Sequence, residues 1–239
     1  MIMKLIQLKQ VLDNKRFLLF TIFIPVAWYV FLYNIQQGIT PNIMLGIAVF
    51  IGIIGNSLAT FSKRISSNNA FYSFESKFSK YTVKNYLLDQ TLVQLVLNTL
   101  IFIVVLAVGV IFFSFPLNSQ LVVQFFLLTI MGIYFSIIGF VIGVRLDEKI
   151  IDTVSFPVII LASMTIIPFA SLGAEGGFME FIGKAQMIFP GYYYTNIVNA
   201  LTTSTSIDVK DVALFIGVFI LNIIPLYFLV PKVKLATVK

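Results

Sequence analysis

The sequence of 239 residues contains no cysteine and no histidine. The absence of cysteine excludes disulfide bridges and thiol catalysis, and the absence of histidine excludes histidine-based catalysis and histidine-ligated metals. Charge is scarce as well, since only 11% of the residues are charged while 59% are hydrophobic. The mean hydropathy is +1.00. A soluble domain of this size could not bury so much apolar surface, so the composition predicts an integral membrane protein.

Several apolar segments are long enough to cross a bilayer, which takes about 20 residues, with about 17–25 tolerated. We expect an all-α integral membrane protein with six transmembrane helices. Residues 1–239 should form one domain, since no repeat or low-complexity linker divides them. The first 16 residues are too polar for a signal-peptide core, so we expect the first helix to insert uncleaved. The predicted spans are residues 17–33, 43–61, 92–113, 121–144, 154–172 and 212–230.

Basic residues fall mainly in alternate loops. If the N-terminus is cytoplasmic, the inside segments are 1–16, 62–91, 145–153 and 231–239, and they hold 14 of the 16 Lys and Arg residues, all but Lys184 and Lys210. The positive-inside rule therefore predicts that both termini are cytoplasmic. The net charge of +6 is attributed to these loops and not to binding of nucleic acid.

The apolar stretch 178–201 could be a seventh span. It contains Glu180, Lys184 and a Pro190–Gly191 break, and a seventh crossing would move the three C-terminal lysines outside. We therefore predict two short re-entrant helices on the outer side, separated at Pro190 and Gly191. Glu180 and Lys184, four residues apart, would pair on one helix face. The alternative is an ordinary outer loop on the membrane surface.

The order of these segments resembles a known family. A polar N-terminal helix, six spans, a long cytoplasmic loop between spans 2 and 3, and a broken apolar segment between spans 5 and 6 resemble the membrane subunit of ABC-2 type (type V) ABC transporters, over the whole chain. The most telling stretches are FPVIILASMTIIPFASLG and FIGKAQMIFPGYYYTNIVNAL, in which Pro157 and Pro168 match the prolines of the fifth span and Pro190 the start of the second re-entrant helix. The loop 62–91 departs from the family pattern, because it lacks the usual glycine and proline.

The resemblance implies a transport subunit and not an enzyme. It implies a permease of a small bacterial ABC exporter in the cytoplasmic (plasma) membrane, moving an amphiphilic peptide or lipid-like substrate outward. The expected partners are a cytoplasmic ABC ATPase dimer, a second permease copy or a paralogue, and membrane lipid. ATP and Mg would be used by the partner, and this chain would bind no cofactor, since GFMEFIGK at 177–184 has the wrong spacing for a phosphate loop. The alternative function is a secondary transporter or passive channel, although no acid or base lies well inside a span.

Two regions could contact the ATPase subunit. An aromatic stripe would form on a helix in loop 2–3, which the resemblance implies is a cytoplasmic coupling helix. Its members are Phe71, Phe74, Phe78 and Tyr81. The stripe could instead pack on the spans or lie at the headgroups, and the charged loop RLDEK could be a solvated turn. The N-terminal helix carries Leu5, Leu8 and Leu12 on one face, as expected for an interfacial helix or a plain anchor. The predicted ATPase contacts are Phe71, Tyr72, Phe74, Glu75, Phe78, Arg145, Asp147 and Glu148.

Two further sets of residues are candidate working parts. Three successive tyrosines cannot share one helix face, so the re-entrant arm could gate the outer mouth or act as an interfacial anchor. Uncharged polar residues within spans would bond across helices or line a substrate path. The segment GFVIG is predicted to pack helices within the subunit. The gate set is Pro190, Gly191, Tyr192, Tyr193 and Tyr194, and the polar set is Asn56, Gln94, Asn98, Gln124 and Asn222.

Overall fold

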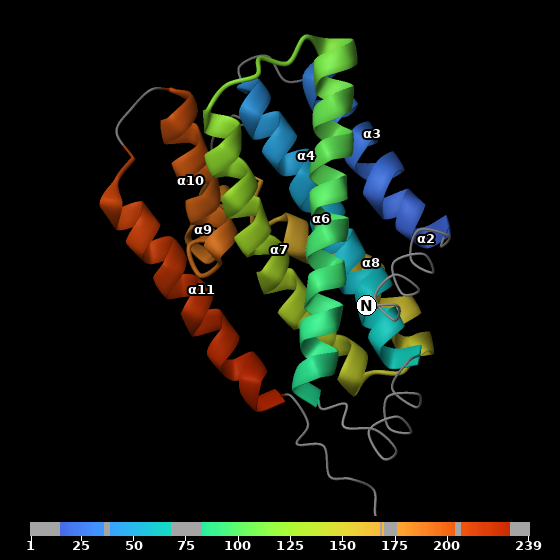
Figure 1. Cartoon of the computed structure of the whole chain (residues 1–239). Helices are drawn as coiled ribbons and strands as arrows, with labels where there is room; N and C mark the ends of the chain where they lie inside the picture. The colour runs from blue at the N-terminus through green and yellow to red at the C-terminus, as the bar shows by residue number, and fades with distance from the viewer. Residues whose placement is uncertain are drawn as a thin grey trace, which may run out of the picture.

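A computed structural model describes residues 15–35, 39–67, 83–167, 169, 176–203 and 207–229. Every regular element in these ranges is a helix, as the predicted all-α class requires (Figure 1). The elements are α2 (Lys15–Leu18), η1 (Leu19–Phe23), α3 (Ile24–Ile35), α4 (Pro41–Gly55), η2 (Asn56–Phe61), α6 (Val83–Phe113), α7 (Gln120–Arg145), α8 (Glu148–Ser163), α9 (Gly177–Gln186), α10 (Pro190–Thr202) and α11 (Val209–Leu229).

Four helices are long and apolar enough to cross a membrane: Pro41–Ser67, Asp89–Phe113, Gln120–Arg145 and Val209–Leu229. They correspond to the predicted spans 2, 3, 4 and 6. The first predicted span lies in the continuous helical stretch 15–35, whose apolar part, Thr21–Ile35, is shorter than these four. Six full spans are therefore not confirmed.

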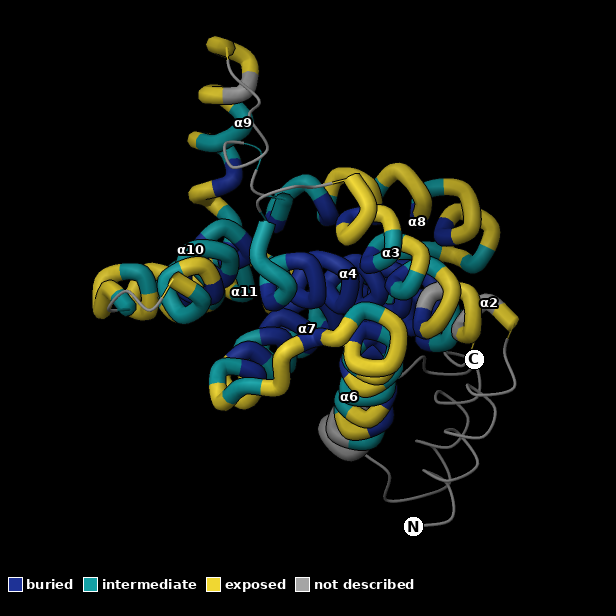
Figure 2. Tube along the Cα trace, turned by 90° about the horizontal axis from the view of Figure 1, so that it is seen from above, coloured by how far each residue is buried: buried dark blue, intermediate teal, exposed yellow. Residues whose placement is uncertain are grey.

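The helix Pro41–Ser67 forms the centre of the bundle, and its most apolar part is completely buried (Figure 2). It packs against α3, α6, α7 and α8, and α10 contacts its first half. Its second half is π-helical over η2, a form that occurs mostly as short bulges, often at functional sites.

Glycines on α7 allow the central helix to approach closely. A Cβ on Gly139 would collide with the backbone oxygen of Ser57, and one on Gly143 with that of Ser62. The prediction that GFVIG packs helices within one subunit is confirmed. Small residues at such crossings are typical of membrane bundles.

The fifth predicted span differs from the structure. The helix α8 begins six residues earlier than predicted, at Glu148, and ends at Ser163, where 154–172 was expected. Its 16 residues measure about 24 Å, less than the roughly 30 Å of a bilayer core. The helix α10 then continues toward the other end of the bundle. Its last turn lies beside the start of α7, where Gln120 donates to the carbonyl of Leu201.

Side chains from the following segment stabilise the end of α8. Gln186 Nε2 donates to the carbonyls of Met164 and Ile167 at 2.6 and 2.8 Å. Thr195 Oγ1 donates to the carbonyl of Ile166 at 3.0 Å. A Cβ on Gly191 would lie 3.0 Å from the carbonyl oxygen of Thr165, so α10 starts in direct contact with this turn. The chain thus passes from one end of the bundle to the other in two short helices.

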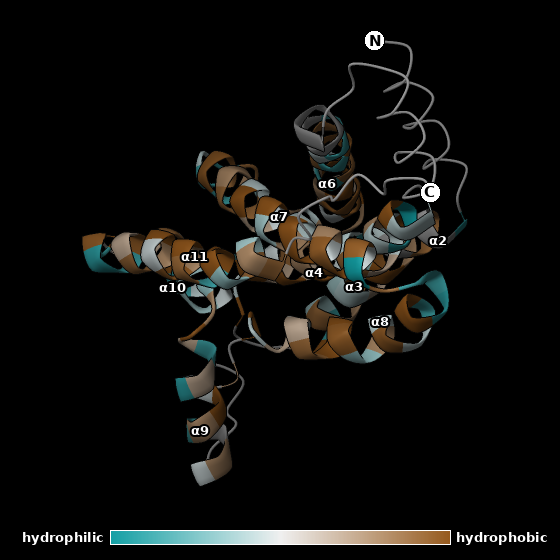
Figure 3. Ribbon diagram, turned by 90° about the horizontal axis from the view of Figure 1, so that it is seen from below, coloured by the Kyte–Doolittle hydropathy of each residue, from teal (hydrophilic) through white to brown (hydrophobic). Residues whose placement is uncertain are grey.

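The helix α9 projects sideways from the bundle, roughly perpendicular to the long helices (Figures 2 and 3). The predicted pair on it is confirmed, since Lys184 Nζ lies 2.8 Å from Glu180 Oε1. The helices α9 and α10 cover the residues predicted for the two short helices, and their re-entrant placement on the outer side stays a prediction. The predicted N-terminal interfacial helix and the predicted coupling helix lie outside the described residues.

Candidate functional site

Polar side chains gather along the central helix in positions closed to solvent. Asn56, Gln94, Asn98 and Gln124 are all buried, and Asn222 is half-buried. The structure divides these predicted residues among three places: a cluster where α10 meets α4 and α7, a seam where η2 meets α6, and the junction of α11 with α7.

The first cluster joins α4, α7 and α10, and we call it the Gln124 cluster. Gln124 Nε2 donates to the carbonyl of Asn42 at 2.8 Å and lies 3.2 Å from the hydroxyl of Tyr194. The side-chain amide of Asn42 returns a bond to Gln124 Oε1 at 3.3 Å. Gly46 provides the space for Tyr194, because a Cβ there would collide with the hydroxyl. One glutamine therefore holds the three helices together.

The tyrosine arm is largely buried within the chain. Tyr194 is 2% exposed and its ring stacks on Phe50 with centroids 6.2 Å apart. Tyr193 is also buried, and Tyr192 is half-buried with its ring edge-on to Tyr193. Pro190 and Gly191 are buried at the start of the arm. Movement of α10 away from the bundle would break the hydrogen bond between Tyr194 and Gln124 and expose the buried ring. The tyrosine arm is therefore anchored to the bundle.

The second cluster lies halfway along the central helix, and we call it the seam. Gln94 Nε2 lies 3.3 Å from both Ser57 Oγ and Asn98 Oδ1. Gly132 on α7 leaves room for the amide of Asn98. Several buried atoms have no hydrogen-bond partner within the described ranges, namely both amide atoms of Asn56, Gln94 Oε1 and Asn98 Nδ2. Each such atom costs about 1–3 kcal/mol, so the seam has unused capacity for water or a ligand.

Asn222 ties α11 to two other elements. Its amide donates to the carbonyl of Ile188 at 2.9 Å, and its oxygen accepts from the hydroxyl of Tyr134 at 3.3 Å. The prediction that the polar residues bond across helices is confirmed for Gln94, Gln124 and Asn222. Their role in a substrate path stays a prediction.

The charged residues around the loop after α7 form contacts within the chain. Asp147 accepts from the backbone N–H of Ile150 at 2.9 Å and so caps α8. Lys63 lies 2.7 Å from Asp152 and 3.9 Å from Glu148. Arg145 Nε donates to the carbonyl of Leu229 at 2.6 Å. These contacts join the end of the central helix to α8, and the end of α7 to that of α11.

Contact of the ATPase with Arg145, Asp147 and Glu148 stays a prediction. Phe71, Tyr72, Phe74, Glu75 and Phe78 lie outside the described residues. Within the described ranges, no acidic residues cluster where they could hold a metal ion.

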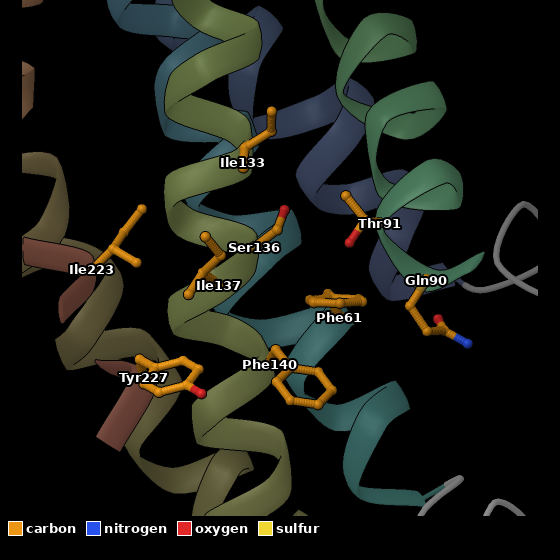
Figure 4. A pocket seen from close by; sticks show the side chains of 9 residues that line it. All are labelled: Phe61, Gln90, Thr91, Ile133, Ser136, Ile137, Phe140, Ile223 and Tyr227. Carbon is orange, nitrogen blue, oxygen red and sulfur yellow. The ribbon is translucent and has the colours of Figure 1, made fainter. Parts of the chain in front are cut away.

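A pocket of about 230 Å³ opens among η2, α6, α7 and α11 (Figure 4). Sequence reasoning missed it, as it missed Asn42 and Gln90. The spacing in the sequence could have indicated Gln90, because Gln90, Gln94 and Asn98 recur every four residues on one face of α6. The pocket is lined by Phe61, Gln90, Thr91, Ile133, Ser136, Ile137, Phe140, Ile223 and Tyr227.

Comparison with protein-family models, curated proteins and solved structures found no match for this chain.

Proposed function

We propose that this chain is the membrane-spanning permease subunit of an ATP-driven exporter, which moves an amphiphilic peptide or lipid-like molecule out of a bacterial cell. The observation that carries the proposal is the broken crossing. The chain leaves the Arg145 end of the bundle in α8, turns, and reaches the opposite end in α10. A broken apolar segment between the fifth and sixth spans is the feature by which the sequence resembles ABC-2 permeases.

In this proposal six crossings are made by the stretch 15–35, the helix Pro41–Ser67, α6, α7, the pair α8 with α10, and α11. Non-helical backbone at membrane depth requires satisfied polar groups, which Gln186 and Thr195 supply at the turn after α8. The basic residues of the loops 62–91 and 145–153 then remain on one side with the termini. The chain lies in the plasma membrane with both termini inside.

The contacts suggest how a conformational change in an ATPase would be transmitted through this chain. Lys63 joins the end of the central helix, just before the segment 68–82, to Asp152 on α8. The other end of α8 touches the start of α10 through Thr195 and Gly191. A displacement of the cytoplasmic loop would therefore reach the anchored arm of α10 through one short helix. ATP and Mg would be bound by the separate ATPase dimer, and a second copy or paralogue would complete the pathway.

Transport in membrane vesicles tests the proposal. Inverted vesicles from cells that express the chain with its neighbouring ATPase should accumulate a labelled amphiphilic peptide only when ATP is present. A Walker-lysine variant of the ATPase is the control and should abolish uptake. Rapid ATP-independent flux by the purified chain alone in liposomes would overturn the proposal.

That same flux would support the second candidate, a secondary transporter or passive channel. The seam favours it, because Asn56, Gln94 and Asn98 keep unpartnered amide atoms in the interior. Substitution of Asn56 by Leu should then reduce the flux, whereas an ATP-driven exporter with its path between subunits would tolerate it.

A further inference from the structure

The helix α9 extends away from the bundle with little support from it. It projects sideways, and none of the main helix–helix packings among the described residues includes it (Figures 2 and 3). A Cβ on Gly177 or Gly183 would meet no described atom within 4 Å. Phe178 and Phe181 are 71% and 67% exposed. Hydrogen bonds from Gln186, its last residue, hold it to the turn after α8. The bundle of one chain therefore leaves most of α9 uncovered.

The depth of α9 in the bundle is given by the contacts of Ile188, two residues after its end. The carbonyl of Ile188 accepts from Asn222, whose oxygen accepts from the hydroxyl of Tyr134. Tyr134 lies 11 residues before Arg145 at the end of α7, which is about 16 Å of helix. Half of a bilayer core is about 15 Å. In a membrane that α7 crosses, α9 therefore runs near the middle of the bilayer, and Figure 1 shows it at about the middle height of the bundle.

A charged pair is exposed on α9 at this depth. Lys184 Nζ lies 2.8 Å from Glu180 Oε1, and the two side chains are 70% and 69% exposed. Charged side chains near the bilayer centre are costly, and those that occur face other protein segments or a water-filled cavity. Pairing them with each other does not remove the cost, because the outward atoms of both would still contact lipid. Lipid is therefore an unfavourable surrounding for this face of α9.

A second copy of this chain supplies the matching charges. Gly177, Glu180, Phe181 and Lys184 follow the spacing i, i+3, i+4 and i+7 and share one face of α9. Homodimers are usually two-fold symmetric, and an axis along the membrane normal would set two α9 helices side by side and antiparallel. Glu180 would then face Lys184 of the second copy, and Lys184 would face its Glu180. Gly177 leaves room on the same face for the helices to approach closely.

We infer that α9 pairs in antiparallel with α9 of a second copy through reciprocal contacts between Glu180 and Lys184. Each carboxylate then lies beside two ammonium groups, and each ammonium group beside two carboxylates, so the charges of both helices are shielded from lipid. This inference deepens the proposed function by naming the surface that joins the two permease copies. It rests on that function only for the role of the dimer in export.

Charge reversal tests the contact, and the measured quantity is association and not transport. The full chain is reconstituted in liposomes with donor and acceptor fluorescent proteins, and energy transfer reports dimers as the protein is diluted in lipid. Glu180→Lys and Lys184→Glu should each raise the dimer dissociation constant at least about tenfold, because like charges then oppose each other. Lys210→Glu, at an exposed position on α11, is the control and should leave it unchanged. A monomeric parent chain, or unchanged association of both α9 variants, would overturn the inference.

Mixing the two variants separates a contact between copies from one within a copy. Both variants carry two like charges on the same helix, so neither regains the internal pair in the mixture. Between copies, however, the two lysines of one chain would face the two glutamates of the other. Heterodimers of Glu180→Lys with Lys184→Glu should therefore form about as readily as parent dimers, whereas each variant alone stays mostly monomeric. Failure of the mixture to recover would mean that the pair acts only within the chain, and the inference would be wrong.

A cross-link keeps the test valid if the charge variants fail to fold. The chain has no cysteine, and Phe181 lies one residue from the midpoint between Glu180 and Lys184, so it would lie near its own copy. A short bismaleimide should join Phe181→Cys into dimers but not Ile220→Cys, which is exposed on α11. Absence of the Phe181→Cys dimer would contradict the antiparallel pairing. ATP-driven export by a monomeric chain would refute only this inference, and dimers without export would refute only the proposed function.

Discussion

At the scale of single residues, the closest contacts depend on glycine. Gly139 lies against the backbone oxygen of Ser57, whereas Gly217 on α11 has open space where a Cβ would be. Gly139→Ala should therefore force α7 away from η2 and lower the free energy of unfolding by about 1–3 kcal/mol. Gly217→Ala should be neutral or raise it by up to about 1 kcal/mol, since alanine favours helix. Unfolding in detergent with increasing SDS measures both, and equal stabilities would contradict the packing described here.

The hydroxyl of Tyr194 provides the second residue-scale prediction. Tyr194→Phe removes one partner of Gln124 and should cost about 0.5–1.5 kcal/mol, in the range of hydrogen bonds between membrane helices. Gln124→Leu should cost more, because it also removes the two hydrogen bonds between Gln124 and Asn42. Tyr227→Phe, at an exposed hydroxyl, is the control and should leave the SDS midpoint unchanged. A Tyr194→Phe midpoint equal to that of the control would show that the Gln124 cluster does not hold α10.

At the scale of helices, hydropathy predicted the long elements and failed at the broken one. The helices α7 and α11 begin and end within three residues of their predicted spans. The end of α8 at Ser163 lies inside an apolar run, so hydrophobicity gave no sign of it. The carbonyls of the turn that follows α8 are satisfied by Gln186 and Thr195, about 20 to 30 residues later in the chain. Such long-range partners do not appear in a local pattern.

The candidate site shows the same limit. Gln94 and Gln124 were predicted as interhelical because a polar residue in an apolar run needs a partner. The partners could not be named, because Tyr194 and Asn42 lie 70 and 82 residues from Gln124 in sequence. Gln90 was missed because α6 begins at Val83, nine residues before the predicted span.

The turn after α8 gives the prediction at this scale. Gln186→Leu removes two hydrogen bonds and leaves the carbonyls of Met164 and Ile167 unpaired, so the free energy of unfolding should fall by about 2–4 kcal/mol. Thr202→Val, which affects a bond only within its own helix, should cost less than about 1 kcal/mol. Hydrogen exchange of α10 should also accelerate in Gln186→Leu, because its start would lose support. Unchanged exchange would contradict the view that this turn couples α8 to α10.

At the scale of the whole molecule, the number of crossings decides the arrangement. If only the four long helices crossed the membrane, Asp208 would lie on the same side as Lys149. The structure argues otherwise, because α11 ends beside Arg145 and must therefore begin at the opposite end of the bundle. If α8 and α10 together make one crossing, as proposed, Asp208 faces the outside and Lys149 the cytoplasm.

The absence of cysteine makes this arrangement directly testable, because each introduced cysteine is then the only thiol. Ser67→Cys, Ser114→Cys, Lys149→Cys and Asp208→Cys all place the thiol at exposed positions of described loops or helix ends. In intact cells a membrane-impermeant maleimide should label Ser114→Cys and Asp208→Cys but not Ser67→Cys or Lys149→Cys, and inverted vesicles should give the reverse. Labelling of Asp208→Cys from the same side as Lys149→Cys would mean that α8 and α10 enter and leave on one side. The broken crossing, and with it the main support for an exporter, would then be wrong.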